Sequence, residues 1–290
     1  MLVLDAGAPR NAPAAGVHGL LARDGIRPAE LLERGRAEVR GYGGQVVAGE
    51  VTTATRDPEG DAGGFTVTLA DGRNFRGRRL LVTTGLVDEL PEVPGLRARW
   101  GRDVLHCPYC HGWEVRDQAI GVLATGPRAV HQALLFRQWS AEVTFLSHTM
   151  APPAGEEAEQ LAARGIGVVE GEVASLEVVQ DRLVGVRLAD GTVVGLQALA
   201  VSPWMVARAG FLAALGLRPA RHPSGLGEHI PSDATGRTEV PGLWVAGNVT
   251  DLAAQVGAAA AGGAAAAAQI NADLVAEDTR RAVALVRAGW

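Results

Sequence analysis

The chain has 290 residues, of which 47% are hydrophobic and 20% are charged, and its formal net charge is −5. This length is enough for two domains with sizeable hydrophobic cores. The acidic balance leaves no basic stripe, which argues against nucleic acid as a partner. No apolar run is long enough to cross a bilayer, and the first residues carry no signal-peptide pattern. We therefore expect no membrane association and a cytoplasmic location.

The first part of the chain predicts a strand, a helix and a β meander. Residues 2–7 (LVLDAG) are an apolar run that ends in an acid and a glycine, which is typical of a buried parallel strand. A helix is expected over 28–41, with Pro28 at its start. Alternation around an Asp-Gly pair predicts a hairpin over 65–75. Another buried strand is expected over 79–85, ending at a glycine.

The same order of elements occurs again further along the chain. The expected elements are a strand at 117–126, a helix at 127–139, a strand at 141–148, a helix at 156–166, strands within 167–202 with a hairpin at Asp190-Gly191, a strand at 241–248 and a long helix at 252–274. Alternating strands and helices imply a parallel sheet with right-handed crossovers. The sequence therefore predicts an α/β fold with two Rossmann-like units, each a βαβ sheet with a β meander.

The second βαβ unit contains a turn, ATGPRA, that approximates the G-x-G-x-x-A turn of dinucleotide-binding folds. Small residues there let backbone N–H groups approach a pyrophosphate at a helix N-terminus. Ala124 replaces the first glycine, which is tolerable only if its φ angle is negative, and Gly126 keeps the second. A nucleotide site and a plain strand-to-helix corner both remain open.

Two strand ends bear on which nucleotide could bind. The strand after this turn ends at Ser147, His148 and Thr149, without the basic residue that an NADP 2′-phosphate needs or the acid that an NAD ribose needs. Asp5 ends the first strand of the chain, where a ribose-binding acid belongs, but its glycine turn would lie about 20 residues earlier. Either Asp5 is only a polar strand end, or a first strand and glycine loop are missing from this chain.

The stretch LHCPYCHGWE (105–114) contains the only two cysteines of the sequence. A zinc site needs four ligands and this motif offers two, while a structural bridge over so short a loop would stabilise little. The remaining interpretation is a cycling dithiol, because a two-residue spacing lets the sulfurs meet and such motifs depress one thiol pKa. His111, next to Cys110, can exchange a proton near neutral pH, or can be a histidine without a role.

Four stretches in this order resemble the low-molecular-weight thioredoxin reductase family of flavoproteins. They are LLVTTGLVDELPEVPG (80–95), CPYCHG (107–112), GVLATGPRAVHQALLF (121–136) and TEVPGLWVAGNVTDLAAQVGAAAAGGAAAA (238–267). The resemblance covers essentially the whole chain. It implies an FAD domain built from 1–92 and 206–290, without its first strand, an inserted pyridine-nucleotide-type domain at 93–205 that carries the cysteines, and a homodimer.

The resemblance also implies the site residues. For FAD these are Asp5, Thr84, Gly85, Gly247, Asn248, Gln255 and Val256, for the nicotinamide nucleotide (NADP or NAD) Ala124 and Gly126, and for catalysis Cys107, Cys110 and His111. Cys110 should face the flavin and Cys107 should attack the partner. That partner would be a thioredoxin-like protein or a small dithiol or disulfide. No metal site is expected.

The chain departs from the family pattern in three places. The first strand with its G-x-G-x-x-G loop has no counterpart, Ser147 and Thr149 stand within the usual arginine-rich NADPH segment, and His111 and Asn248 replace aspartates. The last two departures favour relatives that do not use NADPH, such as ferredoxin-driven reductases and dithiol oxidases that pass electrons to oxygen. A rival of another class is an FAD-free inactive fragment or binding protein.

Overall fold

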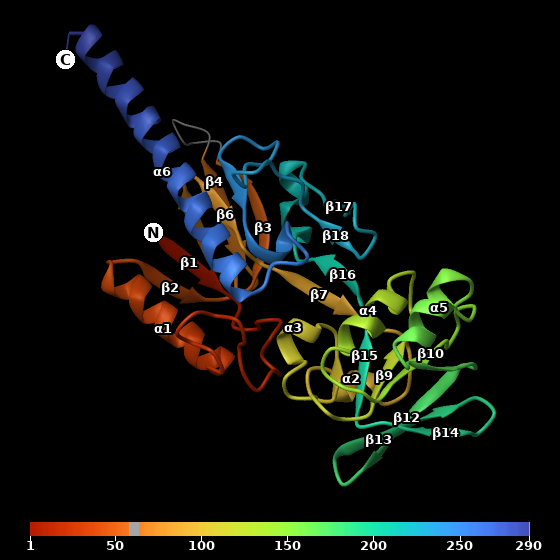
Figure 1. The fold of residues 1–290 in the computed structure, drawn as a ribbon. Coiled ribbons are helices and arrows are strands. Elements are labelled where there is room, and N and C mark those ends of the chain that lie inside the picture. Colours follow the sequence, from red (N-terminus) through yellow and green to blue (C-terminus); the bar gives the residue numbers. More distant parts are fainter. Residues whose placement is uncertain (58–63, 290) are drawn as a thin grey trace. The chain divides into compact units, whose positions relative to one another are not determined.

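A computed structural model of the chain describes residues 1–57 and 64–289. Two compact units divide it: unit 1 comprises 1–10, 33–87 and 205–290, and unit 2 comprises 11–32 and 88–204 (Figure 1). The sequence placed all of 1–92 in one domain, whereas residues 11–32 belong with unit 2. A side-chain hydrogen bond from His18 to Glu114, described below, links that segment to the rest of unit 2. Which cofactor each domain serves stays a prediction.

Unit 2 is built on a five-stranded parallel sheet in the order β11-β10-β9-β15-β8. These strands are β8 (Val104–Leu105), β9 (Ile120–Leu123), β10 (Val143–Leu146), β11 (Gly167–Val169) and β15 (Ala198–Val201). Every residue of β9 and β15 is buried, as expected for strands covered on both faces. Helix α4 (Ala129–Phe136) packs against β9 and β10, and α5 (Glu156–Ala163) packs against β11 (Figure 1). The predicted α/β architecture is confirmed.

Two short helices and an antiparallel meander complete unit 2. They are α2 (Leu96–Arg99), α3 (Pro108–His111), β12 (Val173–Val179), β13 (Arg182–Leu188) and β14 (Val193–Gly195). The predicted hairpin at Asp190-Gly191 joins β13 to β14: Gly191 has φ +91°, and the Asp190 carboxylate accepts a hydrogen bond from the Thr192 N–H. The meander shares a hydrophobic core with the parallel sheet, including Leu176, Val186 and Leu199.

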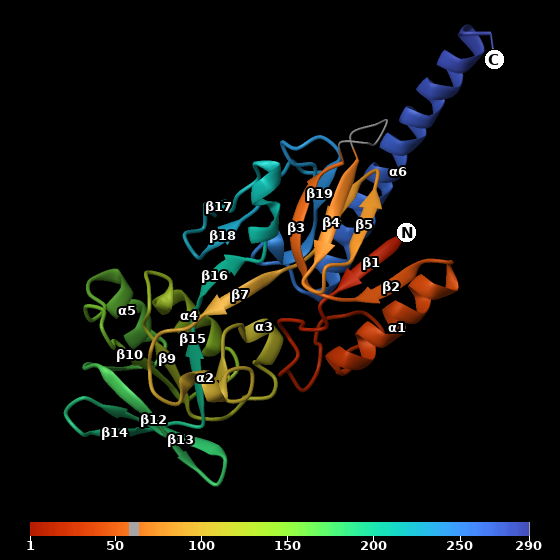
Figure 2. The same cartoon turned by 180° about the vertical axis from the view of Figure 1, so that it is seen from behind.

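Unit 1 contains two separate pairs of parallel strands. Strand β1 (Leu2–Asp5) pairs with β2 (Gln45–Ala48), and β6 (Leu80–Val82) pairs with β19 (Leu243–Val245). Helix α1 (Pro28–Gly41) leads into β2 and has the predicted bounds. The remaining elements of unit 1 are the meander β3 (Val51–Arg56), β4 (Phe65–Leu69) and β5 (Asn74–Gly77), the strand pair β17 (Ala220–Arg221) with β18 (Glu228–His229), and the 3₁₀ helices η1 (Gly210–Leu215) and η2 (Gly247–Val249) (Figure 2). The paired strands β7 (Leu86–Glu89) and β16 (Trp204–Ala207) each include residues of both units.

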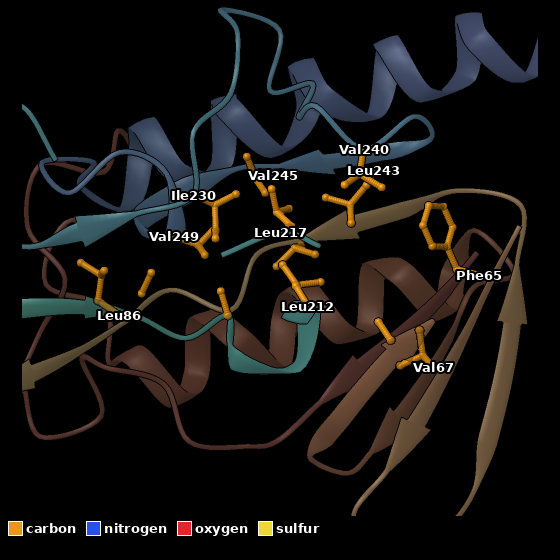
Figure 3. Close-up of a cluster of buried hydrophobic side chains, with 14 of the residues drawn as sticks. Phe65, Val67, Leu86, Leu212, Leu217, Ile230, Val240, Leu243, Val245 and Val249 are labelled. Carbon is orange, nitrogen blue, oxygen red and sulfur yellow. The ribbon is translucent and has the colours of Figure 1, made fainter. Parts of the chain in front are cut away.

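The core of unit 1 brings together segments that are far apart in the sequence. Phe65 of the meander, Leu212 of η1 and Val245 of β19 point into one buried cluster (Figure 3). The two Thr/Val-rich strands of the meander supply its other wall through Ala54 and Val67. This cluster positions the loop that follows β19, which carries the predicted flavin residues.

The last helix, α6 (Val256–Arg287), runs 32 residues and differs from the predicted 252–274 at both ends. Its second half is fixed by ion pairs: Arg79 contacts Asp273 and Glu277, and Arg78 contacts Asp278. Each arginine is far from its acidic partner in the sequence. The apolar pattern of the helix alone therefore could not show where the helix ends. Among residues 1–57 and 64–289, no helix is both long and apolar enough to span a membrane.

Candidate active site

The two cysteines lie on a single helical turn of unit 2. Cys107 is the N-cap residue of α3, with φ −109° and ψ 121°, and Pro108 occupies the first helical position. The backbone N–H groups of Cys110 and His111 both donate to the Cys107 carbonyl, at 3.2 and 3.1 Å. Both cysteines are partly buried. The turn therefore presents the two sulfurs three residues apart on one rigid backbone unit.

Packing and hydrogen bonds fix this turn at both ends. The Gln132 side chain is buried, donates to the His106 carbonyl at 2.8 Å and accepts from the Ser202 hydroxyl at 3.2 Å. At the other end, a Cβ on Gly112 would lie 2.3 Å from Nε1 of Trp139. Only glycine fits there, because real Cβ atoms do not approach other atoms so closely. The sequence motif ends in this glycine for a packing reason.

His111 is the last residue of this turn and is partly buried. Both ring nitrogens are shielded from solvent and have no hydrogen-bond partner among the described residues. Burial lowers the pKa of His111, and the nearby positive charge of His18 acts in the same direction, while Glu114 opposes the shift. A neutral imidazole beside Cys110 can take up a proton that a thiol releases.

A second histidine, which sequence reasoning did not identify as part of the site, lies beside this turn. Nε2 of His18 is 2.7 Å from Oε1 of Glu114, and its Nδ1 is 3.4 Å from the Asp24 carboxylate. The hydrogen bond to Glu114 raises the pKa of His18. Because 96 residues separate His18 from Glu114 in the sequence, no local pattern could pair them. This contact also explains why segment 11–32 belongs with unit 2.

Exposed aromatic side chains flank the cysteines. Tyr109 is 59% exposed and Trp113 is 54% exposed. The Trp113 ring is held edge-on to Trp139 at 6.4 Å, and the Arg116 guanidinium lies 3.9 Å from its centre. An exposed indole that is held in place in this way is a suitable surface for a partner beside the cysteines.

The predicted nucleotide turn in unit 2 forms a strand-to-helix corner. Ala124 is buried and has no left-handed backbone conformation, as its position requires. Thr125 donates through its hydroxyl to the Ser202 carbonyl at 2.9 Å. A Cβ on Gly126 would meet nothing within 4 Å, so nothing in this structure demands glycine there. Open space at this corner is compatible with a ligand and also with an ordinary turn, so its role stays a prediction.

The end of β10, where the resemblance predicts a segment that binds a phosphate, makes internal contacts in this chain. The Ser147 side chain is 1% exposed, and its hydroxyl has no partner among the described residues. His148 has φ +51° and accepts a hydrogen bond on Nδ1 from the Val173 N–H at 3.0 Å. Burial lowers the pKa of His148. Its neutral ring therefore fastens the start of β12 and offers no positive charge to a nucleotide phosphate.

The loop after β19 carries residues that the resemblance predicts for the flavin. Gly247 has φ +71°, the left-handed region that favours glycine. Asn248 donates from Nδ2 to the carbonyls of Asp251 and Ala254, at 3.0 and 2.8 Å, and so shapes the turn into α6. Gln255 is the N-cap residue of α6. The start of a long helix is favourable for the negative charge of a reduced flavin.

Other predicted flavin residues of unit 1 make internal contacts. Thr84 donates through its hydroxyl to the Arg208 carbonyl at 2.6 Å, and the Gly85 carbonyl accepts from the Arg208 N–H at 3.0 Å. The Asp5 carboxylate accepts hydrogen bonds from two guanidinium nitrogens of Arg36, at 3.1 and 2.7 Å, which lowers its pKa. The roles of these three residues towards a flavin therefore stay predictions, and the described residues include no pyrophosphate loop.

Comparison with known proteins places these features in a family. A model of the pyridine nucleotide-disulphide oxidoreductases matches residues 9–268. The chain belongs to this family. Its fold is similar to the crystal structure of HlmI, with 48% identity, a TM-score of 0.90, and coverage of 98% of this chain and 87% of that one. It also resembles the putative thioredoxin reductase TrxB of Bacillus anthracis, with 25% identity, a TM-score of 0.86 and coverage of 95% and 91%.

Curated relatives point to the same branch of the family. Thioredoxin reductase tcpT of Claviceps purpurea is 31% identical over 160 residues, which are 53% of this chain and 50% of that protein. The chain spans about half or less of the length of the curated relatives it matches most strongly. It is a thioredoxin reductase-like member of an oxidoreductase family whose proteins use a flavin and a nicotinamide nucleotide.

Within this family frame, the structure brings some predicted residues together and leaves others in separate contexts. Cys107, Cys110 and His111 share one turn. The predicted flavin residues Gly247, Asn248, Gln255 and Val256 share one loop and helix start, whereas Asp5 lies at the end of β1 and Thr84 and Gly85 follow β6. The roles of these residues in binding a cofactor remain predictions.

Proposed function

We propose that this chain is an FAD-dependent thiol–disulfide oxidoreductase of the thioredoxin reductase type. The observation that carries the proposal is the single turn that holds Cys107, Cys110 and the buried neutral His111. When bound, the flavin would supply or accept the two electrons of dithiol–disulfide exchange. Gly247, Asn248 and the start of α6 would hold its ring end.

The turn suits thiol–disulfide exchange with a partner. In the reducing direction, the Cys107 thiolate attacks one sulfur of a partner disulfide and the other partner sulfur leaves as a thiolate. Cys110 then loses its proton to His111 and attacks the Cys107 sulfur, which releases the second partner sulfur. The partner ends as a dithiol and the cysteine pair as a disulfide. Oxidation of a partner dithiol follows the same steps in reverse.

The partner we favour is a thioredoxin-like protein, with a small dithiol or disulfide as the alternative. Exposed Tyr109 and Trp113 beside the cysteines offer either one an apolar surface. By the same family likeness we expect a homodimer, which light scattering of the purified protein would check. The cytoplasmic location stays an expectation from the sequence.

A second candidate within the same chemistry is an enzyme that does not use NADPH. It is favoured by the strand end at Ser147 and His148. The Ser147 hydroxyl is buried, and Nδ1 of His148 already accepts a hydrogen bond from the Val173 N–H. Such an enzyme would take electrons from ferredoxin or pass them to oxygen. Anaerobic mixing with NADPH separates the two: rapid bleaching of the flavin absorbance supports NADPH, and unchanged absorbance supports the second candidate.

Two experiments test the central proposal. The absorbance spectrum of the isolated protein shows whether it holds a flavin, and a colourless protein would favour the FAD-free inactive or binding alternative. The variant Cys110→Ser should lose dithiol–disulfide turnover and keep any bound flavin, because its backbone turn is unchanged. Asp117→Asn, an exposed position with φ +61° that asparagine tolerates, is the matched control and should keep turnover. Retained turnover in Cys110→Ser would remove the assignment.

A further inference from the structure

Three titratable side chains gather beside the cysteine turn of unit 2: His111, Glu114 and His18. One Glu114 oxygen, Oε1, is 2.7 Å from Nε2 of His18. The other, Oε2, is buried and has no hydrogen-bond partner among the described residues, and the same is true of both ring nitrogens of His111. An ionised carboxylate oxygen is costly to bury in that state unless a positive group can pair with it.

The charges within this cluster act on each other in a definite sense. Glu114 raises the pKa of His111 against the effect of burial, and His18 lowers it. The hydrogen bond from Glu114 raises the pKa of His18, to which Asp24 adds a smaller effect in the same direction. Glu114 is therefore the acidic group that favours protonation of His111, and His18 is the residue that holds Glu114.

We propose that Glu114, held by His18, is a positioning residue that stabilises His111 in its protonated form when a cysteine of the pair releases its thiol proton. The proposal rests on the function proposed above. In this step the S–H bond of the cysteine breaks, the proton binds a ring nitrogen of His111, and a thiolate and an imidazolium result. No electron moves. The Glu114 carboxylate provides the countercharge.

The energetic need for such a group follows from the surroundings of His111. Creating an imidazolium and a thiolate in a partly buried turn separates charge where solvent screens it poorly. The thiolate offsets part of this cost, but it is consumed when it attacks a disulfide, after which the imidazolium remains. The Glu114 carboxylate, three residues after His111 and hydrogen-bonded to His18, offsets the cost throughout, which is the part that Asp and Glu orienting groups have beside other catalytic histidines.

A purely structural role for the same contact makes a different prediction. The hydrogen bond between His18 and Glu114 links segment 11–32 to the rest of unit 2. If this were its only role, loss of the bond would lower stability without changing how thiol reactivity depends on pH. The test therefore measures the rate at which iodoacetamide alkylates the cysteines of the full-length reduced protein as a function of pH. Cys107→Ser and Cys110→Ser backgrounds resolve the two thiols. This readout needs neither a partner nor turnover.

In Glu114→Gln we expect alkylation of at least one cysteine near pH 7 to slow about tenfold, with the profile displaced upward by about one pH unit. Glu114→Asp, which keeps the charge, should recover most of the rate. The double variant Glu114→Gln with His111→Ala should be no slower than His111→Ala alone, because Glu114 acts through His111. The control Asp117→Asn makes the same acid-to-amide change three residues away and should leave the profile where it is.

Two results would overturn the inference: a Glu114→Gln profile that superimposes on that of the unchanged protein, or effects of Glu114→Gln and His111→Ala that add in full. Should Glu114→Gln fail to fold by circular dichroism, Glu114→Asp decides instead. Its shorter side chain keeps the charge but draws it back from His111, and must produce a smaller displacement in the same direction. Loss of dithiol turnover with this coupling intact would count against the proposed function and leave the inference standing.

Discussion

The parallel strands of the two units differ in how they are covered. In unit 2, β9 and β15 lie in the middle of a five-stranded sheet, and all of their residues are buried. In unit 1, the parallel strands form two separate pairs, and no residue of β1 is fully buried. Leu199 of β15 is 0% exposed, whereas Leu2 of β1 is 37% exposed.

This difference shows what an apolar run can and cannot predict. The runs LVLD of β1 and ALAV of β15 look alike in the sequence, and both form parallel strands. Whether such a strand is buried depends on neighbours on both sides, which come from distant parts of the chain. We therefore expect unit 2 to owe its stability to its parallel sheet, and unit 1 to owe more to the cluster around Phe65 and Leu212.

The largest expected effect compares the same substitution in the two sheets. Leu199→Ala removes side-chain atoms from a fully buried site and should destabilise unit 2 by about 2–5 kcal/mol. Leu2→Ala, at a position already exposed, should cost about 0.5 kcal/mol or less. Hydrogen–deuterium exchange resolved by peptide measures each unit separately. Equal loss of protection in both variants would contradict the contrast between the sheets.

How far the sequence led to this fold depends on how local each signal is. Pro28 and the Asp190-Gly191 pair marked a helix start and a hairpin correctly, because both act on their own backbone. The predicted length of α6 was wrong, because ion pairs with Arg78 and Arg79 stabilise the second half of the helix.

The same distinction between local and long-range signals holds for the candidate site. The spacing of Cys107 and Cys110 predicted only that their sulfurs can meet, and the structure adds that both residues lie on one helical turn. The contact of His18 with Glu114 depends on the tertiary fold, and so does the hydrogen bond that makes His148 structural. From the sequence alone, the only observation about His148 was that it stands where an arginine was expected.

The next prediction concerns a glycine of unit 2 that packing requires. Gly112→Ala would force a methyl group against Trp139 and the Pro108 carbonyl, each 2.3 Å from the new Cβ. We expect a loss of about 1–3 kcal/mol, concentrated in the cysteine turn. Gly126→Ala in the same unit, with nothing within 4 Å, is the control and should be close to neutral. Urea unfolding followed by tryptophan fluorescence measures both, and equal midpoints would argue against the packing explanation.

The corresponding glycine of unit 1 is required by its backbone. A Cβ on Gly247 would meet Ala259 at an ordinary 3.6 Å, but its φ of +71° strains any residue with a side chain. Gly247→Ala should therefore cost about 1–2 kcal/mol. Gly247→Asn should cost less, because asparagine tolerates this conformation better, and that ordering is opposite to the one that steric crowding would produce. Thermal unfolding of the three proteins distinguishes the two causes.

The smallest expected effect concerns how the stability of each unit depends on pH, which should differ in sign between the two units. In unit 1, Arg36 lowers the pKa of Asp5, so this pair stabilises the folded state above the ordinary value of 3.8 and loses its effect as pH falls through the lowered pKa. In unit 2, Glu114 raises the pKa of His18 above 6.5, so that pair is fully stabilising below 6.5 and loses its effect as pH rises through the raised value.

Each pair should contribute about 1 kcal/mol or less, because both are partly exposed. The difference in urea stability between the unchanged protein and Asp5→Asn should vanish towards acid pH, and the difference from His18→Asn should shrink towards alkaline pH. Asp24→Asn, which changes the weaker and exposed partner of His18, should show the second trend in reduced form. If both differences changed in the same direction with pH, the opposite signs assigned to the two pairs would be wrong, and the countercharge role of Glu114 would lose its electrostatic basis.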